Sequence, residues 1–283
     1  ELFMPTLSIA EVFGHAVSDL SAKAQAARRA KLCPFRGNQC TKSSKTDPLG
    51  ICSLSDGRYA ALVCPVRFTE NHRMFLDAAR IAFGNDSRFA VVPEVRILRI
   101  ENARGRDTKI GKVDYLLAKL SEGNEVIDFA AVEVQAVYFS GRSTRTPMKH
   151  FLTQGVLPHN SERRPDFRSS AQKRLMPQLH LKVPVFRRWG KKFFVVVDTL
   201  FFDAMPRFRV TTVANSEITW LAYPSSLEGA SYQMGEPEIV YSVWEDIVDA
   251  LREGVAPDPQ EIVDELQTKV LLPENRRPAI LTT

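Results

Sequence analysis

Cysteine is scarce in this chain of 283 residues, and all four cysteines lie within residues 33–64. The sequence has no apolar run long enough to cross a membrane and no visible signal peptide. We therefore expect a reducing bacterial cytoplasm, in which disulfides do not form. A glycine-rich phosphate loop is also absent, so ATP use is not expected.

The composition is that of an ordinary globular protein, with 44% hydrophobic and 25% charged residues. The length fits one large domain or a domain with an attachment. The net charge of +5 is unevenly distributed, because residues 141–192 are strongly basic whereas residues 217–265 hold Arg252 as their sole base. This segregation indicates a face that binds a polyanion such as nucleic acid, although a basic stretch can also be plain solvated surface.

Hydrophobic periodicity and helix caps predict an α/β protein with a mixed central sheet flanked by helices. A capping box at Ser8 and Glu11 predicts a helix that runs to about Lys31. The other predicted helices are residues 70–84, residues 169–181 and two C-terminal helices that begin at Ser242 and Asp258. The predicted strands are residues 90–100, 112–120, 126–139, 191–202, 208–213 and 217–223.

The cysteines, Cys33, Cys40, Cys52 and Cys64, stand in a segment without clear periodicity. Four thiolates can hold a tetrahedral zinc or iron ion, which would replace a hydrophobic core in this segment. The usual CxxC pairs are absent, and four unrelated buried cysteines are the alternative. We expect a structural ion rather than a catalytic one, because four thiolates leave no open position for water.

The predicted strand FAAVEVQAVYF, residues 129–139, carries two polar side chains in an apolar run. Glu133 and Gln135 are two residues apart and therefore point to the same face. Burial of a carboxylate is costly unless it is paired or bound to a metal. The preceding predicted strand contains Asp114, and pairing of the two strands can place Asp114 beside Glu133.

Two carboxylates on adjacent strands form a hard-oxygen site suited to Mg²⁺, to which the backbone carbonyl of Val134 can add a ligand. Such an ion activates a bound water and stabilises charge on a phosphodiester. An Asp followed a hairpin later by Glu-x-Lys is the signature of PD-(D/E)xK nucleases, but Gln135 occupies the lysine position here. Glutamine orients groups only by hydrogen bonds, and Lys112 could replace part of the missing charge. Glu94 is a candidate to touch the metal or its water.

An ordered set of segments resembles the NotI-type restriction endonucleases over roughly residues 30–205. These segments are CPFRGNQC, GICS, CPVRF, PEVRI, KVDYLL, AVEVQAVYFSG, SSAQKRLMPQL and KKFFVVVDTLFF. The resemblance implies a PD-(D/E)xK fold, a four-cysteine module bound to iron, and homodimers that cut palindromic, GC-rich duplex DNA with Mg²⁺. It also implies that the catalytic residues are Asp114, Glu133, Gln135 and Glu94, with glutamine at the lysine position as in the family.

On this interpretation the chain is a type II restriction endonuclease that leaves 5′-phosphates. Its expected parts are an N-terminal helix (1–32), a four-cysteine metal-binding module (33–68), the nuclease core (69–215), and C-terminal strands and helices (216–283) that complete the same domain. The part after about residue 215 resembles nothing that we can name.

Candidate DNA contacts follow the predicted catalytic strand. Arg142, Arg145 and Lys149 could reach phosphates or guanine edges. Contacts to phosphates are expected from Arg163, Arg164, Arg168, Lys173 and Arg174. Either set can instead be solvated surface. Asp198 stands in an apolar strand, and we expect it to be a core residue that accepts backbone hydrogen bonds.

Two other functions are compatible with parts of the sequence. One is a non-catalytic, sequence-specific DNA-binding protein stabilised by a four-cysteine metal site. The other is a redox or metal-storage role for that site. The intact pair of Asp114 and Glu133 favours the nuclease over both.

Overall fold

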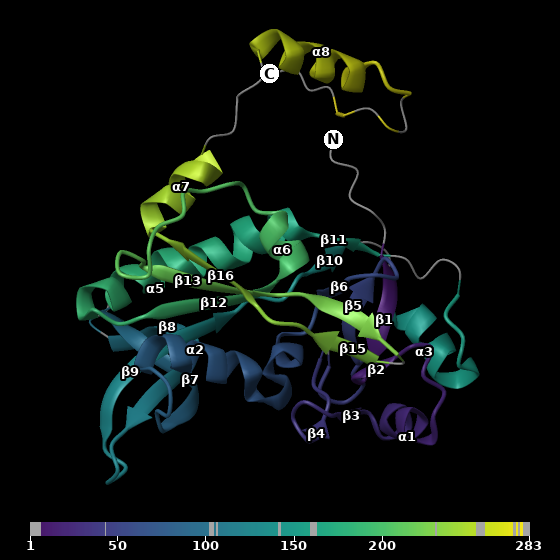
Figure 1. The fold of residues 1–283 in the computed structure, drawn as a ribbon. Coiled ribbons are helices and arrows are strands. Elements are labelled where there is room, and N and C mark those ends of the chain that lie inside the picture. The colour runs from purple at the N-terminus through teal and green to yellow at the C-terminus, as the bar shows by residue number, and fades with distance from the viewer. Residues whose placement is uncertain are drawn as a thin grey trace.

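A six-stranded mixed sheet forms the centre of the computed structural model (Figure 1). The structure describes residues 7–42, 44–101, 105, 107–140, 143–158, 163–229, 231–252, 258–273, 276 and 278–279. In spatial order the strands are β16 (Glu238–Ser242), β13 (Ile218–Tyr223), β12 (Phe193–Asp198), β9 (Val126–Val134), β8 (Asp107–Leu120) and β7 (Phe89–Glu101). The three central strands are parallel and the outer pairings are antiparallel. The predicted α/β class with a mixed sheet is confirmed.

Two helices cover opposite faces of this sheet, α5 (Met176–Trp189) and α2 (Arg73–Phe83) (Figure 1). Strand β12 serves both layers because alternate side chains point to opposite faces. Val195 belongs to the cluster that contains Phe186 of α5, whereas Val196 belongs to the cluster that contains Phe75 of α2. A strand buried on both faces reads as a continuous apolar run, which is why the sequence predicted this strand. The predicted strand over residues 191–202 is too long, because its last four residues belong to the helix α6 (Thr199–Asp203).

A second, four-stranded sheet has the order β2-β1-β5-β6. Its strands are β1 (Ser8–Val12), β2 (His15–Ala16), β5 (Ile51–Ser55) and β6 (Ala60–Leu62). The predicted helix from Ser8 is therefore wrong over its first half, and only α1 (Ala22–Ala30) is helical, capped by the Ser21 side chain. Pairing of β1 with β5, some forty residues away, overrides the local capping pattern.

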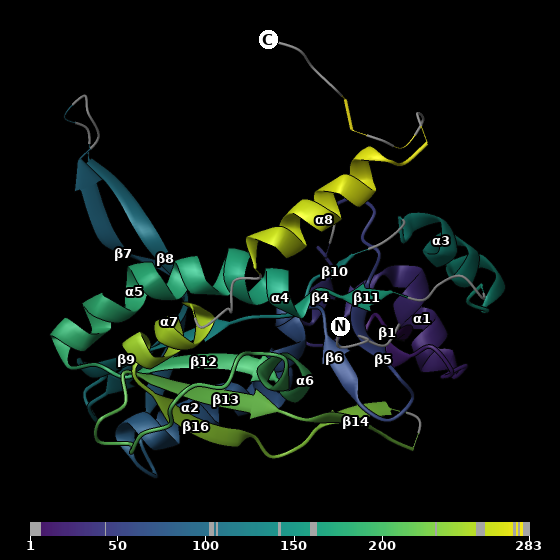
Figure 2. The same ribbon diagram turned by 90° about the horizontal axis from the view of Figure 1, so that it is seen from above.

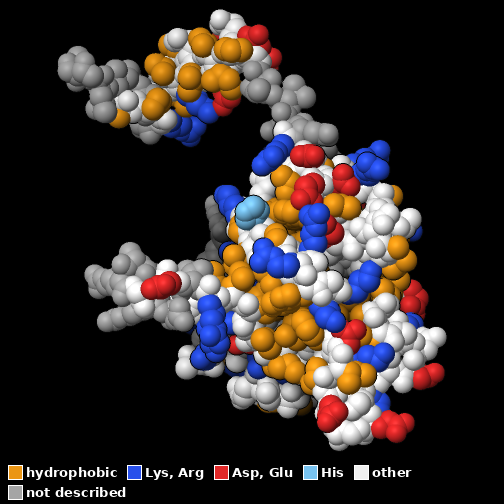
Figure 3. All heavy atoms as spheres, turned by 90° about the vertical axis from the view of Figure 1, so that its left-hand side faces the viewer, with side chains coloured by type: hydrophobic (Ala, Val, Ile, Leu, Met, Phe, Trp, Pro, Cys, Tyr) orange, Lys and Arg blue, Asp and Glu red, His pale blue; other side chains and the backbone are white. Residues whose placement is uncertain are grey.

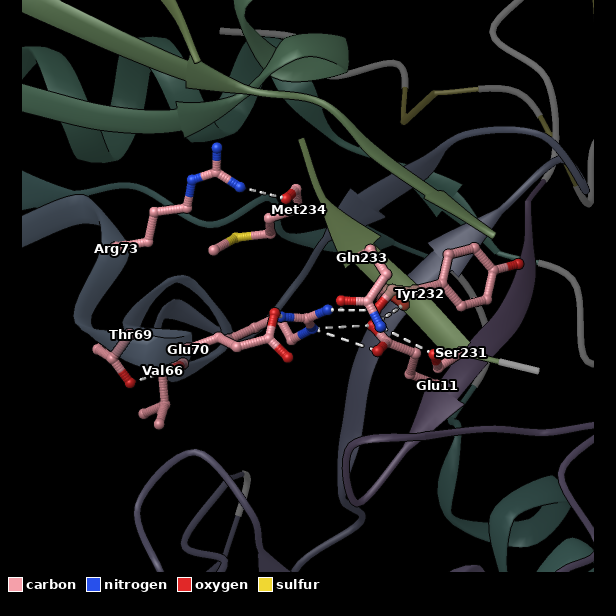
Figure 4. A network of polar contacts seen from close by, with 11 residues as sticks. Glu11, Val66, Thr69, Glu70, Arg73, Ser231, Tyr232, Gln233 and Met234 are labelled. Atoms are coloured by element: carbon pink, nitrogen blue, oxygen red, sulfur yellow. Dashed lines mark hydrogen bonds and ion pairs between the residues drawn. The ribbon is translucent and has the colours of Figure 1, made fainter. Parts of the chain in front are cut away.

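A buried ion-pair network anchors the small sheet (Figure 4). The Arg67 side chain, from the 3₁₀ segment η1 (Pro65–His72), donates from Nε to Glu11 on β1 at 3.2 Å. Its other nitrogens donate to Glu70 Oε2 at 2.6 Å and to the Tyr232 carbonyl at 2.8 Å. Ser53 donates to Glu11 Oε2 at 2.6 Å, and the Arg67 Nε also lies 3.3 Å from this oxygen. Every charged group in this network is paired, which buried charges require.

The remaining elements are three small strand pairs and further helices. The small strand pairs are β3 (Leu32–Cys33) with β4 (Asn38–Gln39), β10 (Phe139–Ser140) with β11 (Arg164–Pro165), and β14 (Ser225–Glu228) with β15 (Ser231–Met234). The further helices are α3 (Arg145–Gln154), α4 (Phe167–Ser169), the π-helical η2 (Ser170–Leu175), α6 (Thr199–Asp203), α7 (Trp244–Arg252) and α8 (Pro259–Val270). The predicted strand at 208–213 is wrong, because this segment makes a single backbone bond to the edge strand, from Thr211 to Tyr241.

Two elements stand away from the body. The β7–β8 hairpin projects beyond the sheet (Figure 2), and α8 lies apart with apolar side chains on its surface (Figure 3). Helix α8 begins at the predicted Asp258–Glu261 capping box and has no buried residue. Within the described residues, no helix is long and apolar enough to cross a membrane.

Candidate active site

Strand register brings the two predicted catalytic carboxylates together. Tyr115 pairs with Val132 across the antiparallel β8–β9 ladder, so the next position sets Asp114 opposite Glu133. On its other side Glu133 pairs with Val195 of the parallel strand β12. The two carboxylates therefore lie where β9 ends and the sheet turns from antiparallel to parallel pairing.

Asp114 is held by the backbone of the neighbouring strand. Its Oδ2 accepts a hydrogen bond from the Val134 N–H at 3.0 Å. Burial raises the pKa of Asp114 above its ordinary value, while the bond from Val134 and the charge of Lys182 oppose this rise. The carboxylate is thus oriented by one oxygen.

Glu133 is buried and has one charged partner among the described residues. Lys182 of α5 donates to its Oε1 at 2.6 Å, and the Lys182 side chain is 0% exposed. The other oxygen, Oε2, is buried and has no hydrogen-bond partner in the described part of the chain. Burial, reinforced by the charge of Asp114, raises the pKa of Glu133 to about 7. A buried carboxylate oxygen without a protein donor is free to bind a cation, so the pair fits a divalent ion with oxygen ligands.

A cavity of about 620 Å³ opens over this pair. Asp114, Glu133, Val134 and Gln135 line one side of it. Its remaining charged lining residues are all basic, namely Lys42, Lys112, Lys173 and Arg174. A cavity with acidic ligands at its base and cations around them matches a negatively charged substrate that meets a metal ion.

The basic wall of the cavity comes from the π-helical segment η2, which contains Lys173 and Arg174. Turns of π-helix are rare in proteins, and those that do occur often lie at functional sites. The Arg174 guanidinium carbon lies 3.4 Å from the centre of the Tyr138 ring, so the ring holds it in place. Lys173 and Arg174, two of the eight predicted DNA contacts, therefore line the same cavity as the carboxylates.

The predicted third and fourth catalytic residues are placed differently. Gln135 lines the cavity, and its Nε2 donates to the Ala136 carbonyl at 2.6 Å. Glu94 has a side chain 70% exposed and accepts a bond from Lys112 at 2.8 Å, which lowers its pKa. Lys112 therefore balances Glu94 rather than Glu133. Glu94 also has a φ of +59°, a strained conformation for a residue other than glycine, of the kind that clusters at functional sites.

The other predicted DNA contacts divide into four cases, of which the first is the exposed pair Arg164 and Arg168. Arg145 and Lys149 lie on α3, where Arg145 forms an ion pair with Asp47 and Lys149 is exposed. Arg163 is buried and donates to the Ser143 carbonyl at 3.3 Å, and its phosphate contact stays a prediction. Arg142 lies outside the described residues.

The four cysteines are buried and form no disulfide. Cys33, Cys40 and Cys64 line one cavity of about 450 Å³, which shares Lys42 and Tyr138 with the cavity over the carboxylates. Burial raises the pKa of Cys33 and Cys40, and that of Cys52 well above its ordinary value. Within the described residues no three Cys, His, Asp or Glu side chains are grouped so that they could hold a metal ion, so the four-cysteine metal site stays a prediction.

Asp198 is the core residue that the sequence indicated. Its Oδ1 accepts from the Phe201 N–H at 2.9 Å and its Oδ2 from the Leu62 N–H at 3.1 Å. It thereby caps α6 and ties β6 to the end of β12. Burial raises the pKa of Asp198 to about 7.

Sequence reasoning missed Lys182. The signal was present, because Leu179, Lys182, Val183 and Phe186 form one apolar face of a helix in which a single lysine is out of place. Burial of a charged side chain without a partner costs free energy, so a lysine on such a face indicates a buried acidic partner elsewhere in the chain.

Comparison with known families adds one finding. The family model described as restriction endonuclease NotI matches residues 11–234 of this chain. The match covers most of the small sheet, the cysteines, both carboxylates and Lys182. A search of curated proteins found no matching relative.

Proposed function

We propose that this chain, which belongs to the NotI family of restriction endonucleases, hydrolyses duplex DNA with Mg²⁺ at a palindromic, GC-rich site and leaves 5′-phosphates. Membership of a restriction endonuclease family implies that the chain binds DNA. The observation that carries the proposal is the buried pair of Asp114 and Glu133 beneath a basic cavity, with one carboxylate oxygen that has no donor within the described residues.

Asp114 and Glu133 would hold the ion, with the Val134 carbonyl as a further ligand. Bound Mg²⁺ would supply an activated water and stabilise negative charge on the phosphate. The chain itself orients the reacting groups. Gln135 lies at the cavity and can direct a water by its amide, with Glu94 as the second acid near Asp114.

DNA phosphates would contact Lys173 and Arg174 at the cavity wall, since both line it. Arg145 and Lys149 on α3, together with Arg142, are proposed to contact the duplex farther from the carboxylates. A homodimer would present two such sites to the two strands of a palindrome. Gel filtration of the protein with and without a short duplex tests this assembly.

The four cysteines are proposed to bind a structural iron or zinc ion. Support comes from the donor chemistry and from the convergence of Cys33, Cys40 and Cys64 on one cavity. Elemental analysis of protein purified without added metal tests the proposal. About one iron or zinc per chain is expected, and metal-free protein with all four thiols titratable would overturn it.

The products test the proposed chemistry directly. DNA fragments cut by the protein should religate without prior treatment and lose this ability after phosphatase, because a 5′-phosphate and a 3′-hydroxyl are required for ligation. The same reaction without Mg²⁺, or with Glu133→Ala, should leave the DNA intact. If Glu133→Ala cleaves DNA at the wild-type rate, the Asp114–Glu133 pair is not the catalytic site.

A further inference from the structure

Lys182 occupies a position that an apolar residue would ordinarily fill. It lies on the face of α5 that packs against the sheet, between Leu179 and Phe186, and its side chain is 0% exposed. Replacement of a buried ion pair by apolar residues is often neutral or stabilising. Stability alone therefore does not account for a lysine here.

Neither Gln135 nor Lys112 supplies positive charge to Glu133. Gln135, at the motif's lysine position, is neutral and donates to the Ala136 carbonyl. Lys112 is 44% exposed and is paired with Glu94 at 2.8 Å. The charge of Lys182 acts on both carboxylates, since it also opposes the rise that burial causes in the pKa of Asp114.

The two carboxylate oxygens of Glu133 have different surroundings. Lys182 donates to Oε1 at 2.6 Å, which fixes the carboxylate in one orientation. Oε2 is left buried without a donor in the described residues, next to Asp114 across the strand pair. A carboxylate held by one oxygen presents the other to a metal ion, as orienting partners do for ligands in metal sites.

We propose that Lys182 is the positioning residue of this site: it holds Glu133 by Oε1 so that Oε2 and Asp114 together bind a divalent cation. A helix residue thereby supplies the charge that the strand motif lacks at Gln135. Because its side chain is fully buried, Lys182 acts through Glu133 and does not touch DNA. The inference rests on the proposed metal-dependent function.

The test is Mn²⁺ binding, measured by electron paramagnetic resonance on the full chain without DNA. Lys182→Met should weaken Mn²⁺ binding roughly 10- to 100-fold, the usual effect of removing an orienting partner. The matched control is Lys191→Met, which removes a lysine–carboxylate contact of the same 2.6 Å length, to Asp128, outside the cavity. The control should bind Mn²⁺ like the wild type, and wild-type affinity in a folded Lys182→Met would overturn the inference.

Two further variants keep the test decisive if Lys182→Met does not fold. Lys182→Arg keeps the charge and should stay within a few-fold of wild-type affinity, whereas Lys182→Gln should bind roughly tenfold more weakly. Equal affinities of these two variants would overturn the inference. A wild type that binds Mn²⁺ but cuts no DNA would sink the proposed function alone, and a wild type that binds no Mn²⁺ would sink both.

Discussion

The Asp114 carboxylate accepts a hydrogen bond from the Val134 N–H at 3.0 Å, across the gap between two strands. This contact closes β8 onto the last residue of β9, and it leaves the second Asp114 oxygen available beside Glu133. This bond orients the Asp114 carboxylate, whereas Lys182 orients that of Glu133. Loss of the acidic group should disturb function more than fold, because the β8–β9 ladder continues on from Tyr115.

Asp114→Asn should lower the rate of DNA cleavage by roughly 100-fold or more. A neutral amide binds a divalent cation weakly, because it has no negative charge to balance that of the ion. The side-chain oxygen can still accept from Val134, so thermal stability should change little. Cleavage of a plasmid under single-turnover conditions measures the rate. Asp128→Asn, at a partly buried ion pair with Lys191 outside the cavity, is the matched control and should cut normally. A fully active Asp114→Asn would contradict the assignment.

The Glu11–Arg67 pair should be essential for stability. Arg67→Met leaves Glu11 buried without its cation and should lower the free energy of unfolding by about 3–5 kcal/mol, measured by urea titration. The double variant Glu11→Leu/Arg67→Met should recover part of this loss because no uncompensated charge remains. Lys269→Met, which removes an exposed pair on α8, should unfold like the wild type. A single variant as stable as the double would refute the pairing.

Asp198 makes stability depend on pH. Its pKa is about 7 in the folded protein and about 3.8 ordinarily, so the unfolded chain releases the proton at lower pH. Stability therefore falls as pH rises toward 7 and is constant above it. Asp198→Asn lacks this titration, so its stability deficit relative to the wild type should shrink by about 2–3 kcal/mol between pH near 5 and pH near 8. Urea titrations of both proteins measure it, and a deficit independent of pH would contradict the buried, protonated carboxyl.

Arg174 should contribute a phosphate contact. Arg174→Ala should weaken DNA binding about equally on all sequences and reduce the salt dependence of the binding constant by about one unit of slope. Fluorescence anisotropy at several salt concentrations measures both effects. Arg80→Ala is the control, because Arg80 is exposed on α2, at the opposite face of the sheet from α5. If the salt dependence of binding is unchanged in Arg174→Ala, Arg174 does not contact a DNA phosphate.

The strands that build the active site were predictable from sequence because their apolar runs and alternation are strong. Residues 90–100, 112–120 and 126–139 correspond to β7, β8 and β9, and the pairing of Asp114 with Glu133 follows from their register. The predicted strand over 126–139 is too long, since β9 ends at Val134 and the chain turns away before β10.

Two features depended on distant contacts and were not predictable from local pattern. The Ser8–Glu11 signature of a helix start is instead part of a strand, because Glu11 pairs with Arg67 and β1 pairs with β5. The partner of Glu133 comes from a helix 49 residues farther along the chain, so no local spacing connects the two. Only the misplaced lysine on an apolar helix face indicated it.

The most direct test of the account is to incubate the purified protein with unmethylated GC-rich bacterial or phage DNA, with and without Mg²⁺, beside Glu133→Ala. The account predicts discrete DNA bands that appear only for the wild type and only with Mg²⁺. Intact DNA on several such substrates, or the same bands from Glu133→Ala, would contradict it.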